Sequence, residues 1–124
     1  MTVKLTFCLR RRPDLSLEEF QRYWLETHGP LVRERAVAMG VRRYVQAHTL
    51  DLPGLHDAYR RRNDGCPEPF DGVAELWFDD LSALGGGEGA KQAAAELLAD
   101  ERNFIDLSRS PMWMSEEHEL YPGT

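Results

Sequence analysis

Residues 15–32 read LSLEEFQRYWLETHGPLV, and this stretch decides most of the predicted fold. Ser16 followed by Glu19 has the pattern of a capping box, in which each side chain accepts a hydrogen bond from the backbone amide of the other residue. Leu15 and Phe20 have the spacing of a hydrophobic staple, which fixes how the chain enters a helix. The stretch therefore predicts a helix that begins just after Ser16.

Large aromatic residues follow at helical spacing in the same stretch. Phe20, Tyr23 and Trp24 recur at three- and four-residue steps, which predicts one buried helix face and brings His28 near it. A Gly-Pro pair comes next, and proline is well accepted in the first turn of a helix. We therefore expect two helical pieces to meet at Pro30, with His28 at the bend between them.

Segments on both sides of this helix have the patterns of strands and of one more helix. Strands are expected at residues 3–9, 41–50, 73–78 and 112–120, and a second amphipathic helix at residues 90–99. The order β-α-β-β-α-β is typical of the ferredoxin-like α+β fold, a four-stranded antiparallel sheet with both helices on one face. The other face of that sheet needs a cover.

A long connection separates the second and third predicted strands. Residues 51–72 contain three prolines, several charges and no sustained period. A binding loop or lid and an ordinary mobile excursion both fit this segment. The basic runs at residues 10–12 and 60–62 are expected to be solvated.

Composition limits the class of protein. The 124 residues suit one domain spanning residues 1–124, and no apolar run is long enough to cross a membrane. The net charge of −6 argues against a nucleic-acid partner. Residues 1–15 do not resemble a secretory signal, and two isolated cysteines indicate free thiols, so we expect a cytoplasmic protein.

Common metal and cofactor motifs are absent from the sequence. The four histidines lack close ligand spacing, and Cys8 and Cys66 cannot complete a structural zinc set. The sequence contains neither a phosphate-binding glycine loop nor the GxSxG turn of serine hydrolases. We therefore expect no metal and no cofactor, with Cys8 packed in the core.

Several segments together resemble the EthD family, within the dimeric α+β barrel superfamily. They are LRRRP (9–13), residues 16–32, RYVQ (43–46), FDGVAELWF (70–78) and DERNFID (100–106). The resemblance implies two subunits packed sheet against sheet, with a ligand cavity in each subunit between its sheet and helices. Members are associated with ether degradation as accessory proteins and with fungal polyketide pathways as dehydratases or decarboxylases. Related barrels include cyclases, cofactor-free monooxygenases, isomerases and haem enzymes, so the fold alone does not imply one reaction.

Histidines are the natural candidates for proton transfer at neutral pH. His28 is the first candidate because aromatic residues flank it, although it could instead fix the helix bend. His48 is the second, since it shares a strand face with Tyr44 and Gln46, although it could simply face solvent. The aromatic residues expected to line the substrate pocket, with core packing as their alternative role, are Tyr23, Trp24, Tyr44 and Trp77.

Acidic residues near the end of the second helix are a further candidate cluster. Asp100, Glu101 and Asp106 could take part in a site, but such residues are usually solvated or paired with a neighbouring arginine such as Arg102. We expect the solvated arrangement.

Two functional classes follow. One is a small cofactor-independent enzyme of lyase or cyclase type, in which His28 or His48 moves protons during dehydration, cyclisation or related chemistry on an apolar or aromatic metabolite. The other is a non-catalytic binding or accessory protein for the oxidative metabolism of small organic molecules. A haem protein is a weaker third option. In each case we expect a homodimer, because a second copy would cover the open sheet face.

Overall fold

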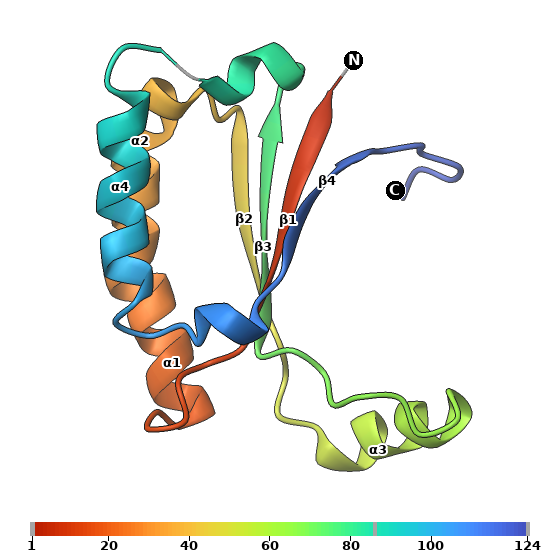
Figure 1. Ribbon diagram of the computed structural model, residues 1–124. Helices are drawn as coiled ribbons and strands as arrows, with labels where there is room; N and C mark the ends of the chain where they lie inside the picture. Colours follow the sequence, from red (N-terminus) through yellow and green to blue (C-terminus); the bar gives the residue numbers. More distant parts are fainter. Residues whose placement is uncertain (1, 86, 124) are drawn as a thin grey trace.

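A sheet of four strands, covered on one face by helices, forms the centre of the computed structural model, which describes residues 2–85 and 87–123 (Figure 1). The strands are β1 (Val3–Leu9), β2 (Arg43–His48), β3 (Gly72–Phe78) and β4 (Met112–Glu116). The α-helices are α1 (Leu17–Tyr23), α2 (Gly29–Met39), α3 (Pro53–Arg62) and α4 (Ala90–Glu101). A π-helical turn, η1 (Trp24–His28), joins α1 to α2, and the 3-10 helices are η2 (Leu81–Gly85) and η3 (Leu107–Arg109).

The strands lie in the order β2-β3-β1-β4, and all neighbouring pairs are antiparallel. This arrangement confirms the predicted α+β fold with a ferredoxin-like sheet. The register aligns Leu5 with Leu76 and Met114, and Leu76 in turn with Tyr44. Because side chains alternate between the two faces of a strand, these residues all point toward the helices.

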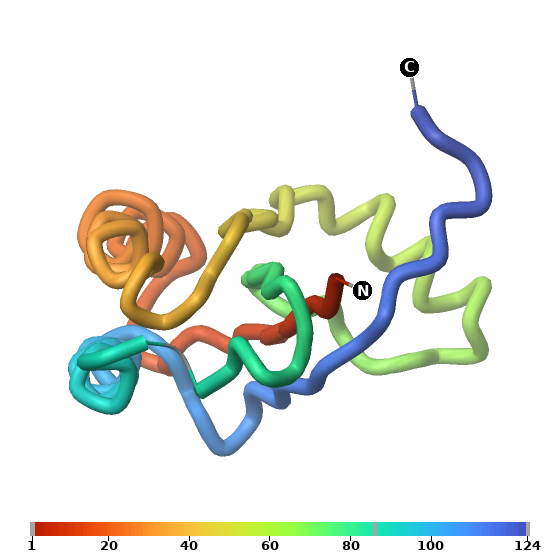
Figure 2. The backbone as a smooth tube through the Cα atoms, turned by 90° about the horizontal axis from the view of Figure 1, so that it is seen from above, coloured from red at the N-terminus to blue at the C-terminus, as the bar shows by residue number. Residues whose placement is uncertain are grey.

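Residues 15–32, the stretch from which the first helix is predicted, form a large part of the helix layer. The capping box is confirmed, because Ser16 Oγ accepts from the Glu19 amide at 3.0 Å and Glu19 Oε1 accepts from the Ser16 amide at 2.9 Å. Phe20 and Trp24 are fully buried, as is Phe104 after α4. The helices α1, α2 and α4 lie on the same side of the sheet (Figures 1 and 2).

The expected break at the Gly-Pro pair takes the form of a wider helical turn. The helix passes without interruption from α1 through η1 into α2, and the Gly29 amide donates to the Trp24 carbonyl, five residues earlier. Pro30 lacks an amide hydrogen, and its ring would crowd the carbonyl of residue 26 in a regular α-helix. A π-helical turn relieves this conflict and keeps both Trp24 and His28 buried.

The segment between β2 and β3 differs from the prediction, because it contains the ten-residue helix α3. No residue of α3 is buried and the segment is strongly polar overall, so it lacks the large apolar residues that mark a core-facing helix. The Arg10 guanidinium donates to the carbonyls of Glu68 and Pro69 at 2.8 and 2.5 Å. The basic run at residues 10–12 is therefore only partly solvated, because Arg10 binds the end of the connection that leads into β3.

The sheet face opposite the helices carries a mixed, partly exposed surface. Trp77 lies on this face, where Lys4 and Arg43 stack over its ring and its indole donates to Glu117. Both α3 and the chain end after β4 extend on this side of the sheet (Figure 2). None of the helices in the described part of the chain has the length and hydropathy of a membrane span.

Candidate functional site

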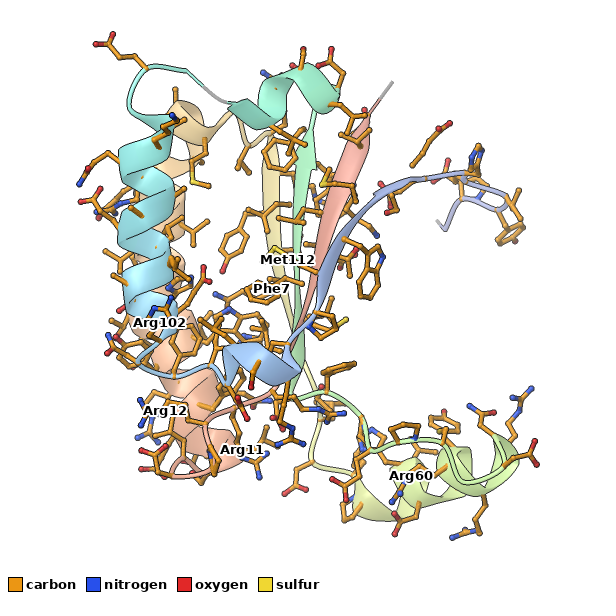
Figure 3. All side chains as sticks on the ribbon, viewed as in Figure 1. Phe7, Arg11, Arg12, Arg60, Arg102 and Met112 are labelled. Carbon is orange, nitrogen blue, oxygen red and sulfur yellow. The ribbon has the colours of Figure 1, made fainter. Side chains whose placement is uncertain are left out.

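A cavity of about 290 Å³ lies between the sheet and the helices. Its wall is mostly aliphatic and aromatic and includes Phe7 and Met112, which are labelled in Figure 3. Three side chains with ionisable or hydroxyl groups interrupt this apolar wall, namely His28, Tyr44 and Glu101. A mostly apolar cavity with few polar groups is the usual form of a small-molecule site.

His28 comes from the π-helical turn and is held by a carboxylate from α4. Its Nδ1 lies 2.7 Å from Asp100 Oδ2, and only 5% of the residue is exposed. Burial lowers the pKa of His28 and outweighs the opposing effect of Asp100. The ring is therefore neutral at pH 7, with Nδ1 donating to Asp100 and the lone pair on Nε2.

Asp100 is itself fixed by two other side chains. Tyr23 donates to its Oδ1 at 2.5 Å, and the Asn103 amide donates to the same oxygen at 3.3 Å. Burial alone would raise the pKa of Asp100, but hydrogen bonds from Tyr23, His28 and Asn103 hold it below its usual value. An ionised Asp100 thus orients the His28 ring and can stabilise its protonated form.

Glu101 follows Asp100 and faces the cavity. Its Oε2 lies 4.0 Å from His28 Nε2. Burial, reinforced by the charge of Asp100, raises the pKa of Glu101 to about 7. The cavity wall therefore holds a neutral imidazole beside a carboxyl group that exists in both protonation states near neutral pH.

A second polar group on the cavity wall comes from β2. The Tyr44 hydroxyl accepts a hydrogen bond from Gln46 Nε2 at 2.7 Å. The Gln46 amide also donates to the Trp24 carbonyl at 2.9 Å, and its Oε1 lies 2.7 Å from His48 Nε2. These contacts join His48 to the cavity through Gln46 and Tyr44.

The six residues expected in the site lie in four places, three of them on the helix side of the sheet. His28, Trp24 and Tyr44 line the cavity. Tyr23 contacts Asp100 behind His28. His48 lies outside the cavity, stacked on the Trp24 ring with centroids 4.5 Å apart.

Trp77 is separated from the other predicted site residues by the sheet. It follows Leu76 in β3, and Leu76 lines the cavity, so the alternation of side chains points Trp77 to the opposite face. The remaining histidines are also remote from the cavity wall. His56 belongs to α3, and His118 is an exposed residue that pairs with Glu116.

The expectation that the acidic residues at the end of α4 are solvated is wrong for two of them. The side chains of Asp100 and Glu101 are 13% and 16% exposed. Asp100 contacts His28 in the π-helical turn, about seventy residues earlier in the chain. The spacing of neighbouring residues in the sequence could not reveal this contact. Within the described ranges, no cluster of three His, Cys, Asp or Glu residues is arranged to hold a metal ion.

Known proteins share this fold and part of this sequence. Decarboxylase AgnL1 of Paecilomyces divaricatus is 24% identical over 116 residues, which are 90% of this chain and 78% of that protein. An EthD family protein of Bacillus halodurans superposes with a TM-score of 0.60 at 20% identity, covering 95% of this chain and all of that one. A dimeric protein with a ferredoxin-like fold from Bacteroides fragilis has a TM-score of 0.62 at 12% identity, covering 94% and 96% of the two chains.

The family is shown by a match that covers most of the chain. The EthD domain model matches residues 12–108, which include the π-helical turn and all of α4. The resemblance noted in the sequence is therefore confirmed, and the chain belongs to the EthD family.

Proposed function

We propose that this protein is a cofactor-independent enzyme that moves protons on an apolar or aromatic metabolite bound between its sheet and helices. The observation that carries the proposal is the buried His28–Asp100 pair, whose free imidazole nitrogen faces Glu101 at the cavity. Dehydration, cyclisation and decarboxylation all need a proton to be removed from or delivered to carbon or oxygen, which these groups can do.

The roles follow from the protonation states. The lone pair on His28 Nε2 accepts a proton from the substrate, and Asp100 stabilises the resulting imidazolium. Glu101, with a pKa of about 7, supplies or takes the second proton. The apolar wall keeps the dielectric constant low, which strengthens both electrostatic effects.

The relative from Paecilomyces divaricatus is named a decarboxylase, which is a lyase. Loss of carbon dioxide leaves an electron pair on carbon that must be protonated. Glu101 as carboxylic acid would deliver that proton, or His28 would do so after it has taken a proton from the carboxyl or hydroxyl group of the substrate. A lyase-type reaction is therefore the form of the proposal that the relative's name favours.

The proposal includes a homodimer of single-domain subunits. The face that carries Trp77 lacks a helical cover in the described part of the chain, and the similar protein from Bacteroides fragilis is dimeric. Two free cysteines, Cys8 and Cys66, are consistent with the cytoplasmic location expected from the sequence.

Deuterium exchange on 2-tetralone tests the chemistry without knowledge of the natural substrate. This bicyclic ketone has acidic hydrogens on C1, and a positioned base that removes one allows deuterium to return from solvent. We expect wild-type protein in D₂O to accelerate this exchange. Proton NMR measures it as the loss of the C1 proton signal of 2-tetralone. Proton-transfer groups contribute about 10²–10⁴-fold, so His28→Asn should remove most of the acceleration.

Two further variants sharpen this experiment. Asp100→Asn should also slow exchange, because it removes the carboxylate that orients and stabilises His28. His118→Asn is the matched control, since His118 is exposed and remote from the cavity. Equal exchange rates for wild type and a folded His28→Asn variant would contradict the proposal. Tight binding of the ketone without any acceleration would favour the binding-protein alternative.

A further inference from the structure

The hydroxyl of Tyr44 has an unusual hydrogen-bond environment. A tyrosine hydroxyl can donate once and accept through its oxygen lone pairs. Gln46 Nε2 must be the donor in its contact with Tyr44, because the same amide group also contacts the Trp24 carbonyl, which can only accept. The contact with Gln46 therefore uses a lone pair of Tyr44 and leaves the O–H hydrogen free.

The orientation of Gln46 is determined by three contacts that agree. Nε2 donates to the Trp24 carbonyl and to the Tyr44 hydroxyl, so Oε1 is the atom that faces His48. Since Oε1 can only accept, His48 carries its hydrogen on Nε2. Burial lowers the pKa of His48, which favours this neutral form. The ring is also stacked on Trp24, which holds His48 in position to donate to Gln46 Oε1 from outside the cavity.

The free hydrogen of Tyr44 has no protein acceptor among the described residues. Burial raises the pKa of Tyr44 above its usual value, although the neighbouring Gln46 amide and Trp24 indole, which both donate, act in the opposite direction. Tyr44 lines the cavity together with His28 and Glu101. On the protein side the hydroxyl meets donors from Gln46 and Trp24, and the Glu101 carboxyl acts on it only through its charge, so the hydroxyl hydrogen is available to an acceptor in the cavity.

The size of the cavity limits the molecule that carries this acceptor. An apolar protein cavity of ~150 Å³ holds one benzene ring. The present cavity, at about 290 Å³, has room for two fused rings. Its wall is mostly apolar, which suits a flat hydrocarbon skeleton with few polar atoms.

We propose that the ligand is a two-ring aromatic or partly aromatic ketone whose oxygen accepts a hydrogen bond from Tyr44, with Gln46 as the positioning residue. This inference rests on the proposed function only in placing the ligand in the same cavity. It assigns His48 to holding Gln46 rather than to proton transfer. The hydrogen bond from Tyr44 also stabilises negative charge on that oxygen when a proton leaves the neighbouring carbon.

Two probes that differ in one carbonyl group test the assignment. 1-Tetralone carries the ketone, and tetralin has the same skeleton without it. Binding of each is measured by calorimetry, and the carbonyl stretch of bound 1-tetralone by infrared difference spectroscopy. In wild-type protein we expect both to bind, with the carbonyl band at lower wavenumber than in an apolar solvent.

Tyr44→Phe removes only the hydroxyl group and should fold normally. Loss of one hydrogen bond is expected to weaken 1-tetralone binding about three- to tenfold, leave tetralin binding unchanged and return the carbonyl band toward its position in apolar solvent. Gln46→Glu replaces the donor amide with an acceptor, which turns the Tyr44 hydrogen away from the cavity. It should shift the band in the same direction.

Several results would overturn the inference. They are an unshifted carbonyl band in wild-type protein, an equal loss of affinity for both probes in Tyr44→Phe, and failure of wild-type protein to bind either probe at millimolar concentration. None of these measurements needs turnover. A shifted band together with no deuterium exchange would therefore reject the enzyme and keep the Tyr44 assignment, whereas exchange without a band shift would do the opposite.

Discussion

Glu101 is the residue whose environment most strongly changes its chemistry. Its pKa rises from 4.5 to about 7 in the folded protein, mainly through burial. Between these values the folded state keeps a proton that the unfolded state has lost. Stability contributed by the protonated form is therefore full below pH 4.5 and is lost as pH rises through about 7. The burial that suits Glu101 to proton transfer thus reduces stability at high pH.

Glu101→Gln should remove this penalty, because glutamine is neutral at every pH. We expect its free energy of unfolding, relative to that of wild type, to increase by about 1–3 kcal/mol between pH 5 and pH 8, which means greater relative stability at high pH. His28 acts in the opposite direction, since its pKa is lowered, so the comparison must be made between variant and wild type. Urea unfolding at both pH values measures the difference. Glu26→Gln, at an exposed position, should show no such trend.

At the scale of single elements, the contact between β3 and the π-helical turn positions the cavity wall. Gly72 begins β3 and packs directly against the Trp24 ring. A Cβ added to Gly72 would lie 2.8 Å from Trp24 Cη2 and 3.0 Å from the Ala47 carbonyl oxygen. No side chain fits there unless the indole moves, so the glycine lets the strand approach the helix.

Gly72→Ala should therefore destabilise the protein by about 1–3 kcal/mol, the usual cost of overpacking. Displacement of Trp24 should also disturb the stacked His48 ring, visible as a shift of its NMR signals. Gly54→Ala in α3 is the matched control, because an added Cβ meets no atom within 4 Å. If the Gly72 and Gly54 variants were equally stable, the close contact between Gly72 and Trp24 would not be what requires a glycine at residue 72.

The elements also show which parts of the structure the sequence predicts. The capping box and the alternation in β1 depend on neighbouring residues, so both were predicted correctly. α3 is not predicted, because it buries no residue and is strongly polar overall. β2 and β4 are shorter than predicted. Residues 41, 42, 49 and 50 lie outside β2, and residues 117–120 continue past the paired part of β4.

The site was less predictable than the fold. Its central contact joins His28 to Asp100 from separate helices, and only the tertiary structure brings them together. The sequence does not show that Trp77 points away from the pocket, because β3 has apolar residues on both faces. The resemblance to the EthD family indicated a cavity but not its polar groups.

At the scale of the whole molecule, the proposed dimer should depend on the sheet face without helices. Val45 lies on that face, since its neighbours Tyr44 and Gln46 point toward the helices. Val45→Glu would place a charge in the proposed interface, whereas Val37→Glu changes a residue of α2 that is 91% exposed. We expect light scattering to report about twice 14.2 kDa for wild type and the Val37 variant, and 14.2 kDa for Val45→Glu. A monomeric wild-type protein at micromolar concentration would exclude the dimer.

The central claim is that the cavity between sheet and helices is the ligand site, with His28 and Tyr44 as its polar contacts. A crystal structure of the protein with 6-bromo-1-tetralone tests this most directly, because anomalous scattering locates the bromine independently of the protein. The account predicts one bromine site inside the cavity, with the ketone oxygen within hydrogen-bond distance of the Tyr44 hydroxyl. Bromine found only on the open sheet face or beside α3 would contradict it.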